Sequence, residues 1–486
     1  VYVGANDGML HAFNGGCFDP SGPRFTKTGG GCSVGHPLGS ELWAYAPYHL
    51  LPHLTWTTNT EYTHVWYVDG KPRVFDARIF GADTDHPDGW GTVLVVGFQF
   101  GGGDITLPAS SYSNGFSDFS VNSLPSSRGK RNLKLGAAYV VLDITNPEKP
   151  PKVLAEISHD DLGFSTSFPT VVAMRERGCK VGGCVDDRWY LAFGNGPDNL
   201  DSITTNLIDA ESSQSGKLFL YDLEAREFVS GTSPIDLGTN ASKGAKDSFV
   251  GDPVTVDWDL DFKADAVFFG TVGGSSDAPD GKLFKLDVKE EASASNWLGP
   301  VVLLDTGNPV TSTPSVTFDE FGNRWVFAGT GRFYSDADKS SSDQQALFGV
   351  IDTADTAAAS NPIRSYSGLV DVTNARVATS GVVDGVSYGG NDITDQLTLV
   401  DTTAQAYGWK LQLSTAPAER NVTSTSLLGD ILFASAFTPS SNLCGGQGRS
   451  ELYGLFFKTG APSPDIPTFS TTPATIAGET VEEAIR

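Results

Sequence analysis

The sequence predicts an all-β fold, a modified β-propeller of seven blades with long loop insertions. Glycine is abundant at 55 residues and proline stands at 27, while methionine is nearly absent at 2, which is a turn-rich composition typical of all-β proteins. A pair of strand patterns also recurs along the chain, as in propellers, whose radial repetition protects the sheet edges. With 486 residues, the chain is long enough for one large repeat domain.

Each repeat couples an apolar run that ends near glycine with a second apolar strand, which in most repeats ends at aspartate. These couplets cover residues 1–4 with 8–13, 94–97 with 138–143, 190–196 with 216–222, 267–271 with 281–287, 326–331 with 346–352, and 431–435 with 451–456. Outer strands are expected at 41–45 and 152–157. One weaker unit, or a blade closed by both ends of the chain, would complete the seven blades. A β-sandwich array is the alternative fold, but it gives no reason for the couplet to recur so often.

Long insertions separate the predicted strands, and a tail follows the last couplet. Residues 14–38 carry two cysteines, 101–134 are rich in Ser, Gly and Asn, and 353–406 are rich in Thr, Asp and Ala. Such loops lie at the surface and often carry binding residues. We assign 1–460 to the propeller and the Pro- and Thr-rich 461–486 to an extended tail or linker. The end of this tail could add a strand or a short helix to a partner.

The charge of the chain argues against several classes of partner. The net charge is −25, from 58 acidic and 33 basic residues. Such a surface repels nucleic-acid phosphates and anionic lipids and favours divalent cations and basic partners. No apolar run approaches the roughly 20 residues that a helix needs to span a bilayer, so we predict no direct membrane insertion. No signal-peptide pattern is present, and we expect a mature product or a fragment of a longer protein.

The five cysteines indicate an oxidising compartment outside the cytoplasm. Cys17 and Cys32 flank a Gly-rich loop, and Cys179 and Cys184 flank a Gly-Gly turn, so both pairs are predicted to form local disulfides. Zinc is the weaker alternative, because neither pair has the C-x-x-C spacing and no histidine cluster accompanies them. Cys444 is left over, either free or paired elsewhere.

Residues 257–265 carry the strongest functional signal. Aspartates stand at the first, third, fifth and ninth positions of this segment, at Asp257, Asp259, Asp261 and Asp265. In an EF-hand-like loop this spacing supplies side-chain oxygens to Ca²⁺, and the backbone carbonyl of Lys263 would take the seventh position. Four clustered anions without a cation would repel one another.

Two residues depart from the full EF-hand pattern. Phe262 stands where the sharp turn expects glycine, and Phe268 stands where a bidentate glutamate would close the site. A half-buried strand is the alternative, because Val256, Trp258 and Leu260 alternate with the aspartates. However, aspartate is depleted in strands, and carboxylates on one strand face would lie only about 7 Å apart. We therefore favour calcium.

Other candidate sites carry weaker signals. His36, His49 and His53 are interpreted as structural histidines, because a metal would need a third ligand brought from elsewhere. The acidic turn at 83–89 is interpreted as an ordinary surface turn. No Gly-x-Ser-x-Gly elbow or Ser-His-Asp order is present, so we predict that the chain is not an enzyme. The alternative is a quinoprotein-like propeller dehydrogenase that uses calcium to bind a quinone, although the chain has no adjacent cysteine pair.

Several motifs match one protein family in order and number. They are residues 2–13, 41–47, 161–165 before Pro169 and Thr170, 194–196, 329–333, 407–409 and 444–446. Together they resemble the β-propeller region of the PilY/PilC family of type IV pilus tip proteins over roughly residues 1–460. The resemblance implies a seven-bladed, modified propeller at the cell surface or pilus tip, exported through the periplasm.

The resemblance also implies a function and a ligand set. The family has a calcium loop whose ligands correspond here to Asp257, Asp259, Asp261, the Lys263 carbonyl and Asp265. Its calcium occupancy is linked to the control of pilus extension and retraction. The expected role is type IV pilus biogenesis and surface adhesion, with minor pilins and a surface or host receptor as partners. The N-terminal adhesive region of the family, typically von Willebrand A-like, has no counterpart in this chain.

Overall fold

The computed structural model describes residues 1–486 except 20, 23, 27, 30–31, 34, 108–132, 177–186, 199–209, 239–243, 276–277, 336, 353–363, 416–417, 441–447, 464–473, 477–478 and 483–486. The chain divides into two compact units. Unit 1 consists of Val1–Gly196, Phe219–Pro234 and Ala292–Ser295, and unit 2 consists of Pro197–Leu218, Ile235–Glu291 and Asn296–Arg486. Each unit is described by itself.

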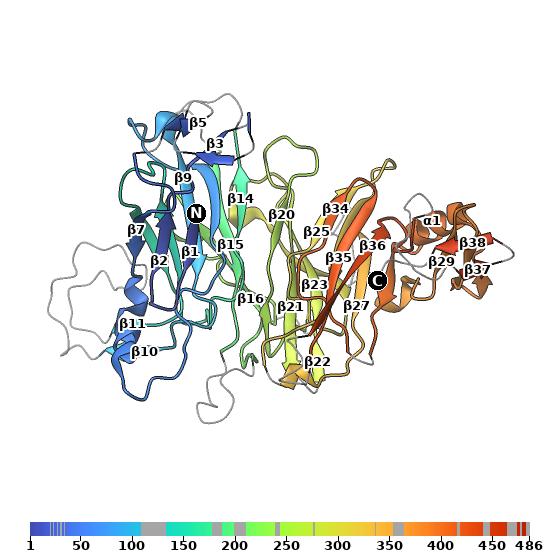
Figure 1. The fold of residues 1–486 in the computed structure, drawn as a ribbon. Helices are drawn as coiled ribbons and strands as arrows, with labels where there is room; N and C mark the ends of the chain where they lie inside the picture. The colour runs from blue at the N-terminus through green and yellow to red at the C-terminus, as the bar shows by residue number, and fades with distance from the viewer. Residues whose placement is uncertain are drawn as a thin grey trace. The chain divides into compact units, whose positions relative to one another are not determined.

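Unit 1 is built from three larger sheets that follow one another in chain order (Figure 1). The first has the order β1-β2-β7, with strands Tyr2–Gly4, Leu10–Phe13 and Glu41–Tyr45. The second has the order β13-β12-β9-β8, with strands Lys152–Ile157, Tyr139–Asp143, Trp90–Gly97 and Arg73–Arg78. The third has the order β14-β15-β16-β17, with strands Thr170–Met174, Arg188–Gly194, Lys217–Asp222 and Glu227–Phe228.

Unit 1 also contains small strand pairs and 3-10 helices. The small strand pairs are β3 (Cys17–Asp19) with β4 (Arg24–Thr26), β5 (Thr28–Gly29) with β6 (Cys32–Ser33), and β10 (Ile105–Leu107) with β11 (Leu133–Leu135). The 3-10 helices are η1 (Tyr48–Thr58) and η2 (Pro87–Gly89). The start of β16 belongs to unit 2, where it pairs with β18 (Ile235–Asp236).

Unit 2 begins with the sheet that carries the predicted calcium loop. Its order is β19-β21-β23-β24, with strands Ser248–Val250, Ala266–Ser275, Lys282–Asp287 and Leu298–Asp305, and β20 (Val254–Val256) and β22 (Ala278–Asp280) also pair with β21. The next sheet has the order β25-β26-β27-β33-β28, with strands Ser315–Phe318, Arg324–Gly329, Ala346–Asp352, Gly408–Gln412 and Val370–Asp371. A third sheet consists of β34 (Ser426–Leu428), β35 (Ile431–Thr438) and β36 (Arg449–Phe456).

Part of the predicted insertion at 353–406 forms structure of its own in unit 2. It contains η5 (Tyr366–Gly368), β28, β29 (Arg376–Ala378), β30 (Val383–Asp384), β31 (Ser387–Tyr388), β32 (Asn391–Asp392) and α1 (Gln396–Gln405). Asp395 caps α1 by accepting a hydrogen bond from the backbone N–H of Thr398 at 2.9 Å. From the C-terminal segment, β37 (Ala474–Ile476) and β38 (Glu479–Glu482) extend the sheet of β29 and β30. The remaining short helices are η3 (Ala294–Asn296) and η4 (Ala337–Lys339).

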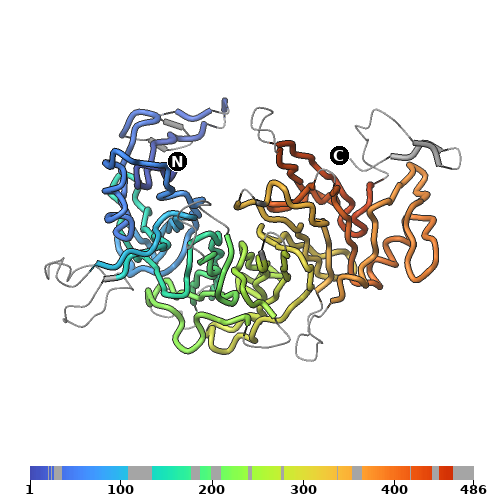
Figure 2. The backbone as a smooth tube through the Cα atoms, turned by 90° about the horizontal axis from the view of Figure 1, so that it is seen from below, coloured from blue at the N-terminus to red at the C-terminus, as the bar shows by residue number. Residues whose placement is uncertain are grey.

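The predicted couplets are confirmed as neighbouring strands. They form the pairs β1/β2, β9/β12, β15/β16, β21/β23, β26/β27 and β35/β36. The outer strands expected at 41–45 and 152–157 are confirmed as β7 and β13. Figure 2 shows the same backbone from below, where the thick coloured tube marks the described residues of each unit.

In many couplets the first strand ends at glycine, because another segment of backbone passes directly against that position. A Cβ atom on Gly97 would lie 2.8 Å from the carbonyl oxygen of Ser165, and one on Gly270 would lie 2.2 Å from that of Val310. Real Cβ atoms essentially never approach a backbone so closely, so only glycine fits at these positions. The recurring glycine therefore sets how closely successive segments pack.

In most couplets the second strand ends at aspartate, whose side chain orders the turn that follows. Asp143 Oδ1 accepts hydrogen bonds from the backbone N–H and the hydroxyl of Thr145, at 3.1 and 2.7 Å. Asp222 Oδ1 accepts hydrogen bonds from the backbone N–H groups of Glu224 and Ala225, at 2.9 and 2.8 Å. These are Asx turns, in which a side chain replaces water as the partner of the first free amides.

The core of each unit consists of apolar side chains from both faces of the central strands. Every residue of β23 and β27 is buried, as expected for strands covered on both sides. Aromatic rings fill much of the space, including the stacked rings of Phe269 and Phe284, whose centroids lie 5.5 Å apart. Burial of such rings is the main contribution to the stability of these sheets.

The cysteine predictions fall only partly on described residues. Cys17 forms a disulfide bond. The side chain of Cys32 and all of Cys179, Cys184 and Cys444 lie outside the described residues. The predicted pairings therefore stay predictions.

Candidate metal centre

Residues 257–265 form the loop of a β-hairpin. The flanking strands β20 and β21 are antiparallel, with Val254 opposite Phe268 and Val256 opposite Ala266. The segment between them contains no strand, so the alternative of an alternating, half-buried strand is wrong. The reason is that the aspartates accept hydrogen bonds from nearby backbone N–H groups, which bends the chain into turns.

The loop turns its carboxylates inward. Asp257 accepts hydrogen bonds from the backbone N–H groups of Asp261, at 3.2 Å, and Phe262, at 2.8 Å. Asp265 closes the other end by accepting from the backbone N–H of Trp258 at 2.6 Å. These bonds hold the first and last aspartates of the pattern on the same side of the turn.

Two apolar residues of the loop have a left-handed backbone and face the solvent. Leu260 has φ 60° and is 69% exposed, and Phe262 has φ 77° and is 46% exposed. A positive φ is unusual for a bulky side chain and costs energy. Phe262 therefore adopts the conformation for which glycine is expected at this position, at the cost of backbone strain.

The structure brings the predicted aspartates together in two overlapping groups. Oxygen atoms of Asp257, Asp259 and Asp265 lie within 4.8 Å of one another, and so do those of Asp259, Asp261 and Glu290. All four predicted aspartates thus take part. Lys263 lies between them in a half-buried position, and the role of its carbonyl stays a prediction.

Sequence reasoning missed Glu290, which lies in the turn after β23. The pairing of β21 with β23 places Ala266 opposite Asp287, so the residues that follow Asp287 run beside the end of the loop. The N–H groups of Val288 and Lys289 donate to the carbonyl of Asp265, at 2.8 and 2.9 Å. The register of the predicted couplet, extended by three residues, could have placed Glu290 beside the loop.

Phe268 lies where an EF-hand would place its closing glutamate. This position falls inside β21, and the Phe268 side chain is fully buried. No closing ligand can come from it, so any further protein ligand must come from another segment.

The electrostatics of the cluster favour a cation. Burial raises the pKa of Asp265, and the charges of neighbouring aspartates raise it further, although a backbone N–H and the guanidinium of Arg324 oppose the shift. Burial also raises the pKa of Glu290, with additional contributions from the charges of Asp261 and Asp259. Both shifts mean that the ionised carboxylates are less stable here than in water, and a bound cation would reverse this effect.

The donor set fits one class of ion. All the clustered side chains offer carboxylate oxygens, and none offers nitrogen or sulfur. Hard cations such as Ca²⁺ and Mg²⁺ prefer such oxygens, whereas zinc and copper sites contain histidine or cysteine. The residues therefore fit the calcium ion that the sequence predicts.

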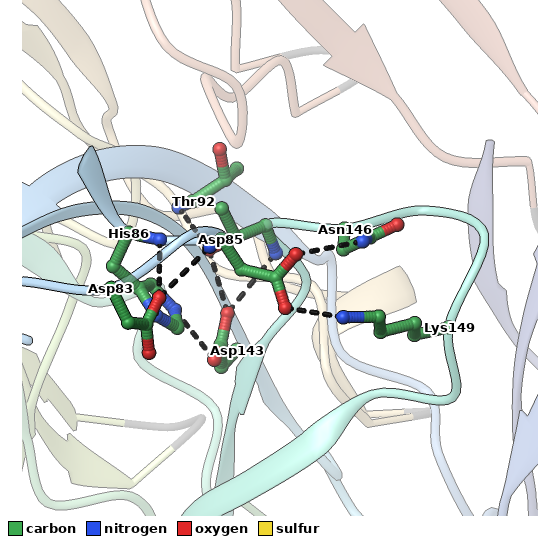
Figure 3. A network of polar contacts seen from close by, with 8 residues as sticks. Asp83, Asp85, His86, Thr92, Asp143, Asn146 and Lys149 are labelled. Carbon is green, nitrogen blue, oxygen red and sulfur yellow. Dashed lines mark hydrogen bonds and ion pairs between the residues drawn. The ribbon is translucent and has the colours of Figure 1, made fainter.

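The second acidic turn has a different arrangement, shown in Figure 3. The ring of His86 lies between two carboxylates, with Nδ1 3.0 Å from Asp83 Oδ1 and Nε2 3.0 Å from Asp143 Oδ2. Asp85 accepts a hydrogen bond from Asn146 at 2.9 Å and forms an ion pair with Lys149. The interpretation of this segment as a structural surface turn agrees with these contacts.

The histidines considered as metal ligands have structural roles where their contacts are described. His49 is fully buried, its Nδ1 accepts the backbone N–H of Gly136 at 3.2 Å, and burial lowers its pKa to about 4. His36 forms an ion pair with Glu148 at 3.3 Å. In the described part of the chain, neither these residues nor His53 join a group of potential metal ligands.

The sequence is similar to pilus proteins over nearly its whole length. It is 24% identical to a "Type IV pilus biogenesis factor PilY1 homolog" of Xylella fastidiosa, covering 94% of this chain and 26% of that protein. It is 25% identical to "Type IV pilus biogenesis factor PilY1" of Pseudomonas aeruginosa, covering 95% of this chain and 34% of that protein. The predicted resemblance is confirmed. The chain spans about a quarter to a third of the length of these curated relatives, and no family model matches it.

A solved structure supports the predicted fold. The crystal structure of the Pseudomonas aeruginosa PilY1 C-terminal domain matches 95% of this chain and 79% of that domain, with a TM-score of 0.57 and 21% identity. The chain is therefore all-β and propeller-like, as predicted, while the count of seven blades stays a prediction. Across the described residues, no helix combines the length and apolar character needed to cross a membrane.

Proposed function

We propose that this chain is the propeller region of a type IV pilus biogenesis factor and that its 257–265 loop binds Ca²⁺. The observation that carries the proposal is the convergence of carboxylates in a chain that is similar over 95% of its length to PilY1. The relatives are named as biogenesis factors and not by a reaction, which favours a non-enzymatic role.

Calcium would stabilise the hairpin through charge. Asp257, Asp259, Asp261 and Asp265 would supply carboxylate oxygens, and the Lys263 carbonyl would supply one more. The ion would neutralise the repulsion among these groups and hold the end of β20 against the start of β21. This rigid hairpin would be the metal-dependent part of a protein located at the cell surface or pilus tip.

The finer roles follow from the same proposal. Calcium occupancy would influence pilus extension and retraction, and surface loops would contact a surface or a host receptor. Minor pilins would be the partners that hold the protein at the pilus tip. The acidic charge of −25 supports a role away from nucleic acids and anionic lipid surfaces.

Calorimetric titration of the chelator-treated chain with calcium tests the metal site. One binding event should be present in the parent and lost in Asp259→Ala. Asp384→Asn is a matched control, because Asp384 is an exposed aspartate on β30 in the same unit. Absence of heat in the parent, with no thermal shift on adding calcium, would contradict the calcium proposal.

The pilus role needs a separate measurement in the organism that encodes the chain. Surface pili should be counted in cells that carry the full-length protein and in cells that carry the same protein with Asp259→Asn. Fewer pili, or altered retraction, in the variant at an equal protein level would support metal-dependent biogenesis. Unchanged pili after deletion of the whole protein would contradict the pilus role.

A further inference from the structure

We propose that Glu290 is an additional calcium ligand that takes the place of the closing glutamate absent from the loop. This inference rests on the proposed function, because it concerns the same ion. It goes beyond the loop pattern, since Glu290 lies 25 residues after Asp265 and belongs to a different hairpin.

The number of oxygen ligands that Ca²⁺ takes calls for one more than the loop supplies. Ca²⁺ takes about six to eight oxygen ligands, and the loop offers four carboxylates and one carbonyl. If each group binds through one oxygen, the loop supplies too few. Phe268 cannot contribute, because it is an apolar side chain buried inside β21.

The position of Glu290 meets this need. Its carboxylate lies in one group with those of Asp259 and Asp261, with the ligand oxygens within 4.8 Å of one another. Asp259 also belongs to the group of Asp257 and Asp265. A cation near Asp259 would thus be within reach of both groups.

The backbone around Glu290 is held against the loop. Its N–H donates to the carbonyl of Ala264 at 3.1 Å, next to the two bonds that Val288 and Lys289 make to Asp265. Lys289 and Glu290 both have a positive φ, of 53° and 59°, so the chain makes a tight left-handed turn here. The turn holds the Glu290 carboxylate beside those of Asp259 and Asp261.

The direction in which the melting temperature changes when the carboxylate is removed distinguishes a calcium ligand from a residue that only lies nearby. Without an ion, an extra carboxylate beside Asp259 and Asp261 adds repulsion, so its removal should raise the melting temperature or leave it unchanged. With calcium, the same removal should lower the melting temperature relative to the parent, because one ligand is lost. A residue that only supports the turn would lower it in both conditions.

The test compares Glu290→Gln with Glu291→Gln in the full chain. Glu291 is the neighbouring exposed carboxylate, so its substitution removes the same charge one residue away. Glu290→Gln should weaken calcium binding by about tenfold or more, because loss even of groups that only support a metal ligand costs 10 to 100-fold. Glu291→Gln should bind calcium like the parent.

A direct count of coordinated water gives the second readout. Europium(III) occupies calcium sites, and its luminescence decay in H₂O and D₂O reports the number of bound water molecules. Glu290→Gln should bind about one more water than the parent, because water fills the vacated position. Glu290→Asp keeps the charge on a shorter side chain and should also bind about one more water than the parent. It replaces Glu290→Gln in this test if that variant folds poorly.

The outcomes distinguish this inference from the function on which it rests. If the parent binds calcium and Glu290→Gln binds it equally well, with an unchanged water count, Glu290 is not a ligand while the loop site stands. If the parent binds no calcium, both the loop site and the role of Glu290 are overturned.

Discussion

The acidic turn at 83–89 in unit 1 and the acidic loop at 257–265 in unit 2 contain similar residues but differ in their counter-charges. In the turn, Asp83 and Asp143 flank His86, and Asp85 contacts Lys149. In the loop, the carboxylates lie beside one another and accept mainly backbone N–H groups.

This difference shows that an Asp-x-Asp pattern alone does not identify a metal site. Asp83 and Asp85 have the same spacing as Asp257 and Asp259. Only in the first pair does one aspartate contact a histidine of the same turn, His86, and the other a lysine of another segment, Lys149. In the loop the carboxylates gather with one another, and the charges of Arg324 and Lys263 do not reverse the upward shifts in the pKa of Asp265 and Glu290. We therefore propose an external cation as their partner.

The largest expected effect comes from breaking the internal pair in unit 1. Asp143→Ala removes a buried partner of His86 and the acceptor for the turn at Thr145. We expect unit 1 to lose about 3 kcal/mol of its free energy of unfolding, because a buried polar group would be left without its partner. Calorimetry should show the same loss with calcium and with chelator. A loss that depends on calcium would contradict the distinction between the two regions.

Removal of a carboxylate from the loop should, in contrast, change the stability by an amount that depends on calcium. Asp257→Asn should match or exceed the parent in chelator, since it reduces repulsion. In calcium at about 100 times the dissociation constant, it should lack the roughly 2.7 kcal/mol of stabilisation that binding gives the parent. Thermal unfolding in the two conditions measures both effects. Equal destabilisation of the variant in both conditions would show that Asp257 acts only as a turn cap.

Relief of backbone strain in the loop should stabilise unit 2 by a smaller amount. Phe262→Gly places glycine at φ 77° and should add about 1 kcal/mol to the free energy of unfolding, since strain of this kind costs about 1–3 kcal/mol and glycine loses part of that gain to entropy. Phe318→Gly is the matched control, because Phe318 is an exposed phenylalanine in the regular strand β25. The control should be destabilised. Destabilisation of both variants would indicate that the Phe262 ring makes contacts that outweigh the strain.

The smallest effect concerns pH and a second histidine between carboxylates in unit 1. A hydrogen bond to Glu41 raises the pKa of His11, and Asp7 adds to the shift, against the effect of burial. A raised pKa in the folded state contributes stability that is full below about pH 6.5, the unfolded value, and is lost as the pH rises through the folded value.

Solvent screens this contribution, because the side chains of Asp7 and Glu41 are nearly half exposed. We therefore expect only about 0.5 kcal/mol. Denaturant unfolding of the parent and of His11→Gln at about pH 5.5 and pH 8 measures it. The two proteins should differ more at the lower pH; an equal difference at both values would show that the bonds of His11 do not depend on its charge.

The sequence allowed correct prediction of features that local patterns encode. The couplets were predictable because a continuous apolar run, a glycine and an aspartate leave a pattern within most strand pairs, as in β21 and β23. The convergence of Asp257, Asp259, Asp261 and Asp265 was predictable because their spacing within one loop limits the possible arrangements. Features that depend on a second segment were not predictable in the same way.

Two such features show where the limit lies. Glu290 joins the cluster through the register of β23, which lies outside the aspartate pattern of 257–265. Asp143 contacts His86 across 57 residues of sequence, so this partner of the acidic turn could not be predicted from the local pattern. Each is decided by tertiary structure, not by local propensity.

The close approach of Gly97 to Ser165 and of Gly270 to Val310 bears on how far such a chain can diverge. At these points a glycine faces the carbonyl oxygen of another segment, and the Val310 side chain also lies against Gly270, so the spacing depends on the absence of a Cβ atom. Neighbouring positions can then change while the distance between segments is kept. Such glycines, where they are kept, would be one physical means by which chains that share only 21% of their residues retain one fold over 95% of this chain. It also indicates that a single added methyl group at Gly97 or Gly270 would not be tolerated.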